Sequence, residues 1–165
     1  MKISKLSYLE ELGGVLCHGC FDMLHAGHVR LFTEAAKLGL LTVTITADRF
    51  LTHRVSGQPV YPQELRAEMI SALACVQHVA IVDDATALPA ISTIHPRVYC
   101  KGAEERREGN DTLHAEMVAV RRFGGRIIFI EKELPYSTSR LLSGEFLGHT
   151  QPIPYQSYVI GTATV

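Results

Sequence analysis

Short apolar runs alternate along the chain with longer segments in which apolar residues recur every three or four positions. The short runs are rich in β-branched residues and predict strands, at residues 14–18, 41–47, 79–82, 97–100 and 126–130. The periodic segments predict helices, over residues 27–38 before Gly39, from Pro62 through Leu65, Met69 and Leu73, over 87–94, and from a cap at Asp111 or Thr112 to Phe123. The chain therefore alternates strand and helix.

This alternation predicts an α/β fold, because each helix can carry the chain back to start the next parallel strand. Right-handed crossovers then give a Rossmann-like, doubly wound sheet of five parallel strands in a single domain. We expect this domain to span residues 1–142. The pattern dissolves over residues 143–165, which we expect to form a tail packed on the domain or on a partner subunit.

Composition narrows the classes of protein without naming one. The 165 residues are 47% hydrophobic and 20% charged, which suits a globular domain. With 16 basic against 17 acidic residues, the net charge is -1, so the chain lacks the basic surface of a nucleic-acid binder. No signal peptide or membrane span is evident, and we expect a cytoplasmic protein with its four cysteines reduced.

Candidate chemistry follows the first predicted strand, where ligands bind in a doubly wound sheet. His25 and His28 lie on either side of Gly27 as the next helix begins. A helix N-terminus attracts anions through its free N–H groups and its dipole. Gly27 lets a phosphate approach the backbone, and the two imidazoles can donate to the same polyphosphate. The segment therefore predicts a phosphate site.

The same residues leave a second interpretation open. Cys17 and Cys20 form a Cys-x-x-Cys pair that, with His25 and His28, imitates a set of zinc ligands or a thiol redox site. Against this, Cys17 lies near the end of a predicted buried strand, and no helix starts directly after Cys20.

Residues 18–28, His-Gly-Cys-Phe-Asp-Met-Leu-His-Ala-Gly-His, resemble the signature of the cytidylyltransferase-like nucleotidyltransferases. The similarity is strongest to the nucleotidyltransferase domain of ADP-heptose synthase, and the family also includes glycerol-3-phosphate cytidylyltransferase. Three further segments resemble family segments in the same order: residues 57–66, 99–102 and 136–140. Together the resemblance covers residues 14–142.

The resemblance implies an activity. A nucleoside monophosphate moves from an NTP (CTP or ATP) to a phosphorylated small acceptor, a sugar-phosphate or polyol-phosphate, and pyrophosphate leaves. Mg²⁺ would arrive on the triphosphate, with no direct protein ligand, and the family habit is a homodimer. Asp22 would brace the loop rather than bind metal.

The resemblance also implies roles for particular residues. His25 and His28 would steady the α- and β-phosphates, and Arg66 would hold the β/γ-phosphates. Arg54 lies in a loop that could close over the triphosphate, with His53 as a competitor for that role. Further nucleotide contacts are implied for Gly19, Cys20, Phe21, Gly27, Lys101, Ser137, Thr138 and Ser139.

The sequence departs from the family after Gly102. Many relatives place aspartates and an aromatic residue there, whereas residues 103–106 read Ala-Glu-Glu-Arg. This departure leaves the acceptor and the nucleobase open. It also motivates a second hypothesis, a nucleotide sensor that keeps the pocket without catalysing transfer.

Overall fold

The computed structural model describes residues 2–51, 59–106 and 109–131. Five parallel strands form one sheet in the order β3-β2-β1-β4-β5. The strands are β1 (Val15–Gly19), β2 (Leu41–Thr46), β3 (His78–Val82), β4 (Val98–Gly102) and β5 (Arg126–Ile130). The α-helices are α1 (Ala26–Ala36), α2 (Gln63–Ser71), α3 (Leu88–Ile94) and α4 (Asp111–Arg122). The expected Rossmann-like α/β fold is confirmed.

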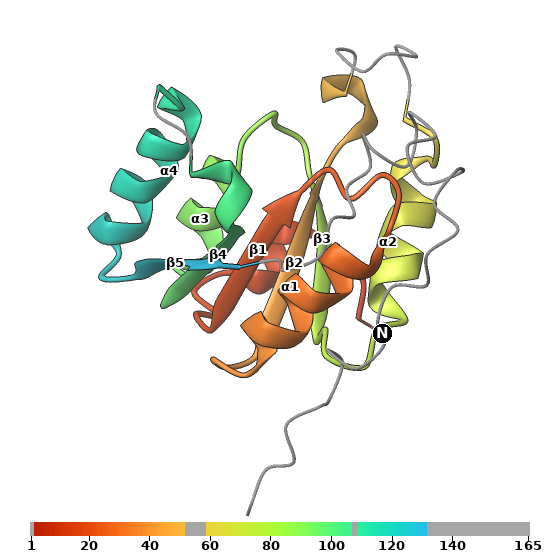
Figure 1. The fold of residues 1–165 in the computed structure, drawn as a ribbon. Helices are drawn as coiled ribbons and strands as arrows, with labels where there is room; N and C mark the ends of the chain where they lie inside the picture. Colours follow the sequence, from red (N-terminus) through yellow and green to blue (C-terminus); the bar gives the residue numbers. More distant parts are fainter. Residues whose placement is uncertain (1, 52–58, 107–108, 132–165) are drawn as a thin grey trace, which may run out of the picture.

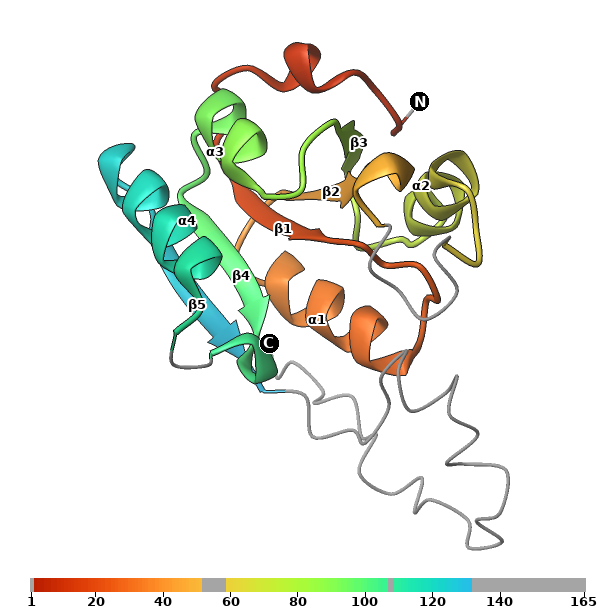
Figure 2. The ribbon, with the colours of Figure 1, turned by 90° about the horizontal axis from the view of Figure 1, so that it is seen from above.

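The helices cover both faces of the sheet (Figures 1 and 2). On one face, α1 and α2 pack Phe32 and Ile70 against Cys17 and Val43. On the other face, α3 and α4 pack against a second core that includes Tyr99. Because both faces are covered, β2 is buried along its whole length although its apolar residues alternate with threonines. None of the described helices is long and apolar enough to cross a membrane.

The N-terminal segment adds a feature that the apolar pattern does not reveal. Ile3 forms an isolated parallel bridge to Val79 at the outer edge of β3. The amide of Ser4 donates to the Val79 carbonyl, and the Val79 amide donates to the Lys2 carbonyl. A 3-10 turn, η1 (Leu6–Leu9), then leads to buried Leu9 in the second core. This segment protects an otherwise unpaired sheet edge.

One expected helix boundary is wrong. The cap of α4 is Asn110 and not Asp111 or Thr112, since the Asn110 side chain accepts from the Leu113 amide at 3.0 Å. The side-chain oxygen of an N-cap residue bonds to the amide of the residue two or three positions later. Leu113 is three positions after Asn110, so Asn110 is the N-cap. The proposed boundary between the domain and the tail at 142/143 lies outside the described residues.

Candidate functional site

The strand order reverses beside β1, which lies between β2 and β4 at the centre of the sheet. Connections from β1 and β4 leave toward opposite faces, so their carboxyl ends border a crevice. The segment from Gly19 to His25 emerges at this crevice and leads into α1. The fold therefore brings the candidate phosphate segment to the position where parallel α/β sheets bind ligands.

His25 and His28 lie together at the N-terminus of α1. Their rings stack with centroids 3.7 Å apart and an interplanar angle of 25°. His25 is the N-cap residue, and its Nδ1 accepts a hydrogen bond from the Gly27 amide at 3.1 Å. An accepting Nδ1 carries no proton, so the neutral ring has its N–H at Nε2. The cap thus fixes the tautomer and leaves Nε2 as the donor.

Phe21 shapes the segment that precedes the histidines. Its backbone has a positive φ of 46°, an uncommon conformation for a bulky residue. Its ring packs edge-on against His28 at 5.0 Å and against Phe32 at 4.9 Å between centroids. A Cβ added at Gly19 would meet this ring at 3.0 Å. Gly19 and Phe21 therefore shape the loop, and the buried Phe21 side chain orients His28.

Asp22 braces the same loop from below, as expected from the sequence. It is buried, with one carboxylate oxygen accepting from the Val60 amide and the other from the Tyr61 amide, both at 3.0 Å. These bonds tie the loop after β1 to the segment before α2. Both carboxylate oxygens of Asp22 are thus engaged by backbone amides of that segment.

Arg66 lies inside the protein beneath this loop. Its side chain is 0% exposed. The guanidinium donates to the backbone carbonyls of Cys20, Thr46 and Tyr61. It also pairs with Asp48, with 2.6 Å between Nη2 and Oδ1. The structure therefore joins Arg66 to the Cys20 backbone of the candidate segment through a cluster of acceptors.

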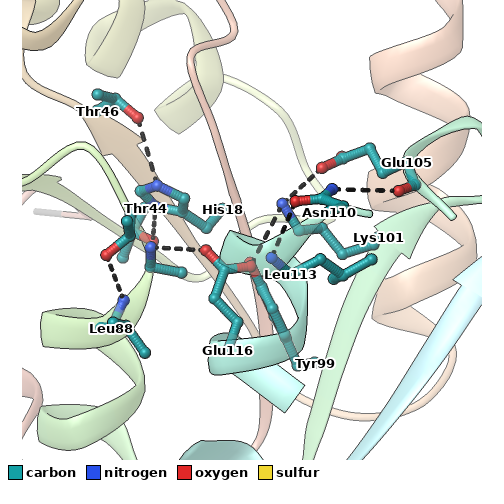
Figure 3. A network of polar contacts seen from close by, with 12 residues as sticks. His18, Thr44, Thr46, Leu88, Tyr99, Lys101, Glu105, Asn110, Leu113 and Glu116 are labelled. Carbon is teal, nitrogen blue, oxygen red and sulfur yellow. Dashed lines mark hydrogen bonds and ion pairs between the residues drawn. The ribbon is translucent and has the colours of Figure 1, made fainter. Parts of the chain in front are cut away.

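Lys101 is the penultimate residue of β4 and lies on the sheet face that α3 and α4 cover (Figure 3). Its ammonium lies 2.6 Å from Glu105 and 3.7 Å from Glu116. Burial lowers the pKa of Lys101, but the two carboxylates outweigh burial and raise it above its ordinary value. Lys101 is therefore protonated, and the carboxylates of Glu105 and Glu116 balance its positive charge.

Glu116 collects donors from three directions in the same network (Figure 3). It accepts from the Ala87 amide at 2.9 Å and from the Tyr99 hydroxyl at 3.0 Å, while Lys101 approaches the second oxygen. Burial, followed by the nearby Glu116 carboxylate, raises the pKa of Tyr99. A buried carboxylate with its donors satisfied fixes α4 against β4.

His18 lies in β1 next to Lys101 and is 6% exposed. Its two ring nitrogens lie 3.0 Å from Oγ1 of Thr44 and 3.3 Å from Oγ1 of Thr46 (Figure 3). Burial, and then the Lys101 charge, lower the pKa of His18 from 6.5 to about 3. His18 is therefore neutral at physiological pH and forms hydrogen bonds with the two threonine hydroxyls.

Two cavities lie toward the carboxyl ends of the strands, and neither is lined by the loop after β1 or by His25 and His28. The first, about 570 Å³, is lined by residues 47–49 after β2, by Asp83 after β3, and by Gln63 and Glu64 of α2. The second, about 350 Å³, is lined by residues that include Arg106 after β4 and Phe129 of β5. The first cavity therefore lies on the β2 side of β1, and the second lies on the β4 side.

The structure brings together only part of the set expected from the sequence. One loop and helix start contains Gly19, Cys20, Phe21, His25, Gly27 and His28. Arg66 bonds to this loop through the Cys20 carbonyl, whereas Lys101 pairs with Glu105 and Glu116 on the face that α3 and α4 cover. Arg54, His53, Ser137, Thr138 and Ser139 lie outside the described residues.

The structure does not assemble the residues of the zinc interpretation into a metal site. Within residues 2–51, 59–106 and 109–131, no group of three or more His, Cys, Asp or Glu side chains could hold a metal ion. Cys17 is 0% exposed in the core and lies in register with Cys100 on the neighbouring strand. Cys20 is partly exposed and offers its carbonyl to Arg66.

Three polar residues of this region were not anticipated from the sequence. In the sequence, His18 stands out only as the first residue of the motif, and neither Asp48 nor Glu116 stands out. An ion pair such as Asp48–Arg66, between residues 18 positions apart, leaves no local signal. For Glu116, the cue was its position on the apolar stripe of α4, three residues after Leu113 and four before Val120.

A Rossmann-like sheet with paired histidines at the start of its first crossover helix is the arrangement of a nucleotidyltransferase domain. Residues 16–142 match the family model described as "Cytidylyltransferase-like". This match spans well over half of the chain, so the chain belongs to the cytidylyltransferase-like family and is an enzyme of the nucleotidyltransferase class.

Curated relatives agree with this assignment. The bifunctional protein HldE of Gluconobacter oxydans (strain 621H) is 35% identical over 133 residues, which cover 79% of this chain and 27% of that protein. Its namesake in Rhodopseudomonas palustris (strain BisA53) is 37% identical over 129 residues, covering 76% of this chain and 25% of that protein. The chain therefore spans about a quarter of the length of these relatives.

Solved structures share the fold at lower identity. A lipopolysaccharide core biosynthesis protein from Thermoplasma volcanium GSS1 aligns with a TM-score of 0.57 and 22% identity, covering 76% of this chain and 98% of that chain. A pantoate-beta-alanine ligase from Francisella tularensis, complexed with beta-gamma ATP and beta-alanine, aligns with a TM-score of 0.57 and 11% identity, covering 94% and 81%.

Proposed function

We propose that the chain transfers a nucleoside monophosphate from CTP or ATP to a sugar-phosphate or polyol-phosphate and releases pyrophosphate. The observation that carries this proposal is the stacked pair His25 and His28 at the N-terminus of α1. The cap leaves the N–H donor of His25 on Nε2 at a helix N-terminus, where the dipole also favours negative charge. A polyphosphate is the ligand that uses both features.

For this transfer the protein must position the two substrates and stabilise the negative charge that develops in the transition state. An oxygen of the acceptor phosphate attacks the α-phosphorus in line, one new P–O bond forms, and the bond from the α-phosphorus to the bridging oxygen breaks. The departing pyrophosphate carries the electrons of that bond. Donors at His25 and His28 stabilise the charge that grows on these oxygens, and such a preorganised donor is worth about 10²–10³ in rate.

The larger of the two cavities offers polar groups for the acceptor. The larger cavity contains Arg49, which pairs with Asp83, together with Asp48, Gln63 and Glu64. Carboxylates and an amide accept hydrogen bonds from hydroxyl groups. This lining favours a polyhydroxylated acceptor such as a sugar or polyol.

We further propose that Mg²⁺ enters bound to the triphosphate. Phosphate oxygens are hard ligands that Mg²⁺ prefers, and the ion then neutralises part of their charge. Arg54, Ser137, Thr138 and Ser139 remain proposed phosphate contacts, Lys101 a proposed nucleotide or acceptor contact, and a homodimer the proposed assembly. Each of these rests on the family resemblance.

Pyrophosphate release tests the proposal. The protein is mixed with Mg²⁺, one NTP and a panel of phosphorylated sugars and polyols, and pyrophosphate is measured by a coupled assay. Acceptor-dependent release that His25→Asn abolishes supports transfer. Tight NTP binding with no release for any pair would favour the nucleotide sensor instead.

A further inference from the structure

Arg66 makes hydrogen bonds to three separate segments of the backbone. Nη1 donates to the Cys20 carbonyl just after β1, and Nη2 donates to the Thr46 carbonyl at the end of β2 at 2.9 Å. Nε donates to the Tyr61 carbonyl before α2 at 3.1 Å. Backbone carbonyls cannot leave without moving the chain, so these bonds fix the relative positions of the three segments.

The charge of Arg66 is also compensated inside the protein. Asp48 Oδ1 lies 2.6 Å from Nη2 of the fully buried arginine, and the Asp48 side chain is itself 32% exposed. An anionic phosphate that approached this guanidinium would meet the Asp48 carboxylate and would have to displace backbone acceptors. Breaking a buried, hydrogen-bonded pair leaves polar groups without partners. The surroundings of Arg66 therefore disfavour direct contact with a phosphate.

We propose that Arg66 is a positioning residue that holds the Cys20 backbone and the ends of β1 and β2 in their binding geometry, and that it does not itself contact the triphosphate. This inference rests on the proposed function and assigns Arg66 a different part from the β/γ-phosphate contact that the family resemblance implies. Because Asp22 ties the same loop to the Val60 and Tyr61 amides, the Arg66 and Asp22 bonds together clamp the loop between two fixed segments.

Asp48 connects this clamp to the larger cavity. Its Oδ2 accepts from the Gln63 amide at 3.1 Å, and the Gln63 side-chain oxygen accepts from the Asp48 amide at 3.0 Å. Both residues line the cavity proposed for the acceptor. Asp48 therefore lines the proposed acceptor cavity and also pairs with Arg66, whose guanidinium bonds to the Cys20 carbonyl. Through these contacts, Asp48 connects the acceptor cavity to the loop that contains Cys20.

The variant Asp48→Asn distinguishes a positioning role of Arg66 from a direct phosphate contact, and Glu64→Gln is its control. Both changes remove one negative charge from the same cavity, but only Asp48 pairs with Arg66. Inorganic pyrophosphate is the probe, measured by titration calorimetry on the full chain. A positioning role predicts equal pyrophosphate affinity for the two variants, within about threefold, together with a lower unfolding midpoint for Asp48→Asn alone. Pyrophosphate binding about tenfold tighter in Asp48→Asn than in Glu64→Gln, the gain expected from a freed cation, would overturn the inference.

Arg66→Lys provides the second variant, since lysine keeps the charge but cannot reach four acceptors. A positioning role predicts a fall in kcat and in thermal stability that exceeds any change in pyrophosphate affinity. Lost pyrophosphate affinity with unchanged kcat and stability would contradict it. If the unaltered protein binds no pyrophosphate and transfers no nucleotide, the proposed function fails. The Arg66 inference is then decided by unfolding, and equal midpoints for Asp48→Asn and Glu64→Gln would overturn it.

Discussion

Nδ1 of His25 accepts a hydrogen bond from the Gly27 amide at 3.1 Å, so a single histidine both caps α1 and keeps its N–H donor on the other ring nitrogen, Nε2. The two duties belong to different atoms of the same ring. A substitution can therefore remove the Nε2 donor and keep the cap.

His25→Asn is the variant that achieves this separation. Asparagine is among the best N-cap residues, so we expect stability to change by less than about 0.5 kcal/mol. The lost imidazole donor should lower kcat on the order of 10²–10³-fold. Steady-state pyrophosphate release and urea unfolding measure the two quantities. His25→Ala, which removes cap and donor together, should lose the same rate and about 1 kcal/mol more of stability.

Gly19→Ala tests the shape of the loop. The new methyl group would meet the Phe21 ring at 3.0 to 3.3 Å, so the ring must move away from His28. We expect a loss of about 1–2 kcal/mol in unfolding free energy together with weaker pyrophosphate binding. Phe21→Leu in the same chain removes the obstructing ring and should recover part of the stability. Additive losses in the double variant would contradict this contact.

Loss of the Glu116 carboxylate should lower the free energy of unfolding more than loss of the Glu105 carboxylate, although both pair with Lys101. Glu116→Gln removes the charge that faces Lys101 and turns an N–H₂ group toward existing donors, which we expect to cost about 2–4 kcal/mol. Glu105 is 38% exposed, and water can replace it, so Glu105→Gln should cost about 1 kcal/mol or less. Denaturant unfolding of both variants gives the comparison. Equal losses would show that the deep contact is no stronger than the surface one.

His18 makes stability depend on pH. Its pKa is about 3 in the folded chain against 6.5 ordinarily, so below pH 6.5 the unfolded chain binds a proton that the folded chain does not. Stability should therefore fall as the pH drops from 6.5 toward 3, by at most about 1.4 kcal/mol per pH unit from this group. Urea unfolding at pH 7, 6 and 5 should show a shallower loss for His18→Asn. His114→Asn, at an exposed position, should keep the original slope.

Much of the fold was accessible from sequence because local pattern and tertiary environment agree. The β5 prediction matches its bounds, and the β1 prediction differs by one residue at each end. The sequence also predicts that His25 and His28 lie together at the start of a helix, and the structure stacks their rings there; their phosphate chemistry stays a prediction. Both features depend on residues close together along the chain.

Other features arise only when distant segments meet. Burial of Arg66 requires carbonyls from three segments and the carboxylate of Asp48, and no spacing rule encodes that meeting. The α4 cap was placed one or two residues late because Asn, Asp and Thr all cap well and stand side by side. N-cap propensity alone does not distinguish these three residues, and the observed cap depends on where the first turn of α4 begins.

Acceptor-dependent pyrophosphate release, compared between the unaltered chain and His25→Asn, tests the central claim most directly. We expect at least one combination of CTP or ATP with a phosphorylated sugar or polyol to release pyrophosphate in the presence of Mg²⁺. The stably folded His25→Asn variant should release it on the order of 10²–10³-fold more slowly. Equal release by the two proteins, or no release from any combination despite bound nucleotide, would contradict nucleotidyl transfer at the His25–His28 site.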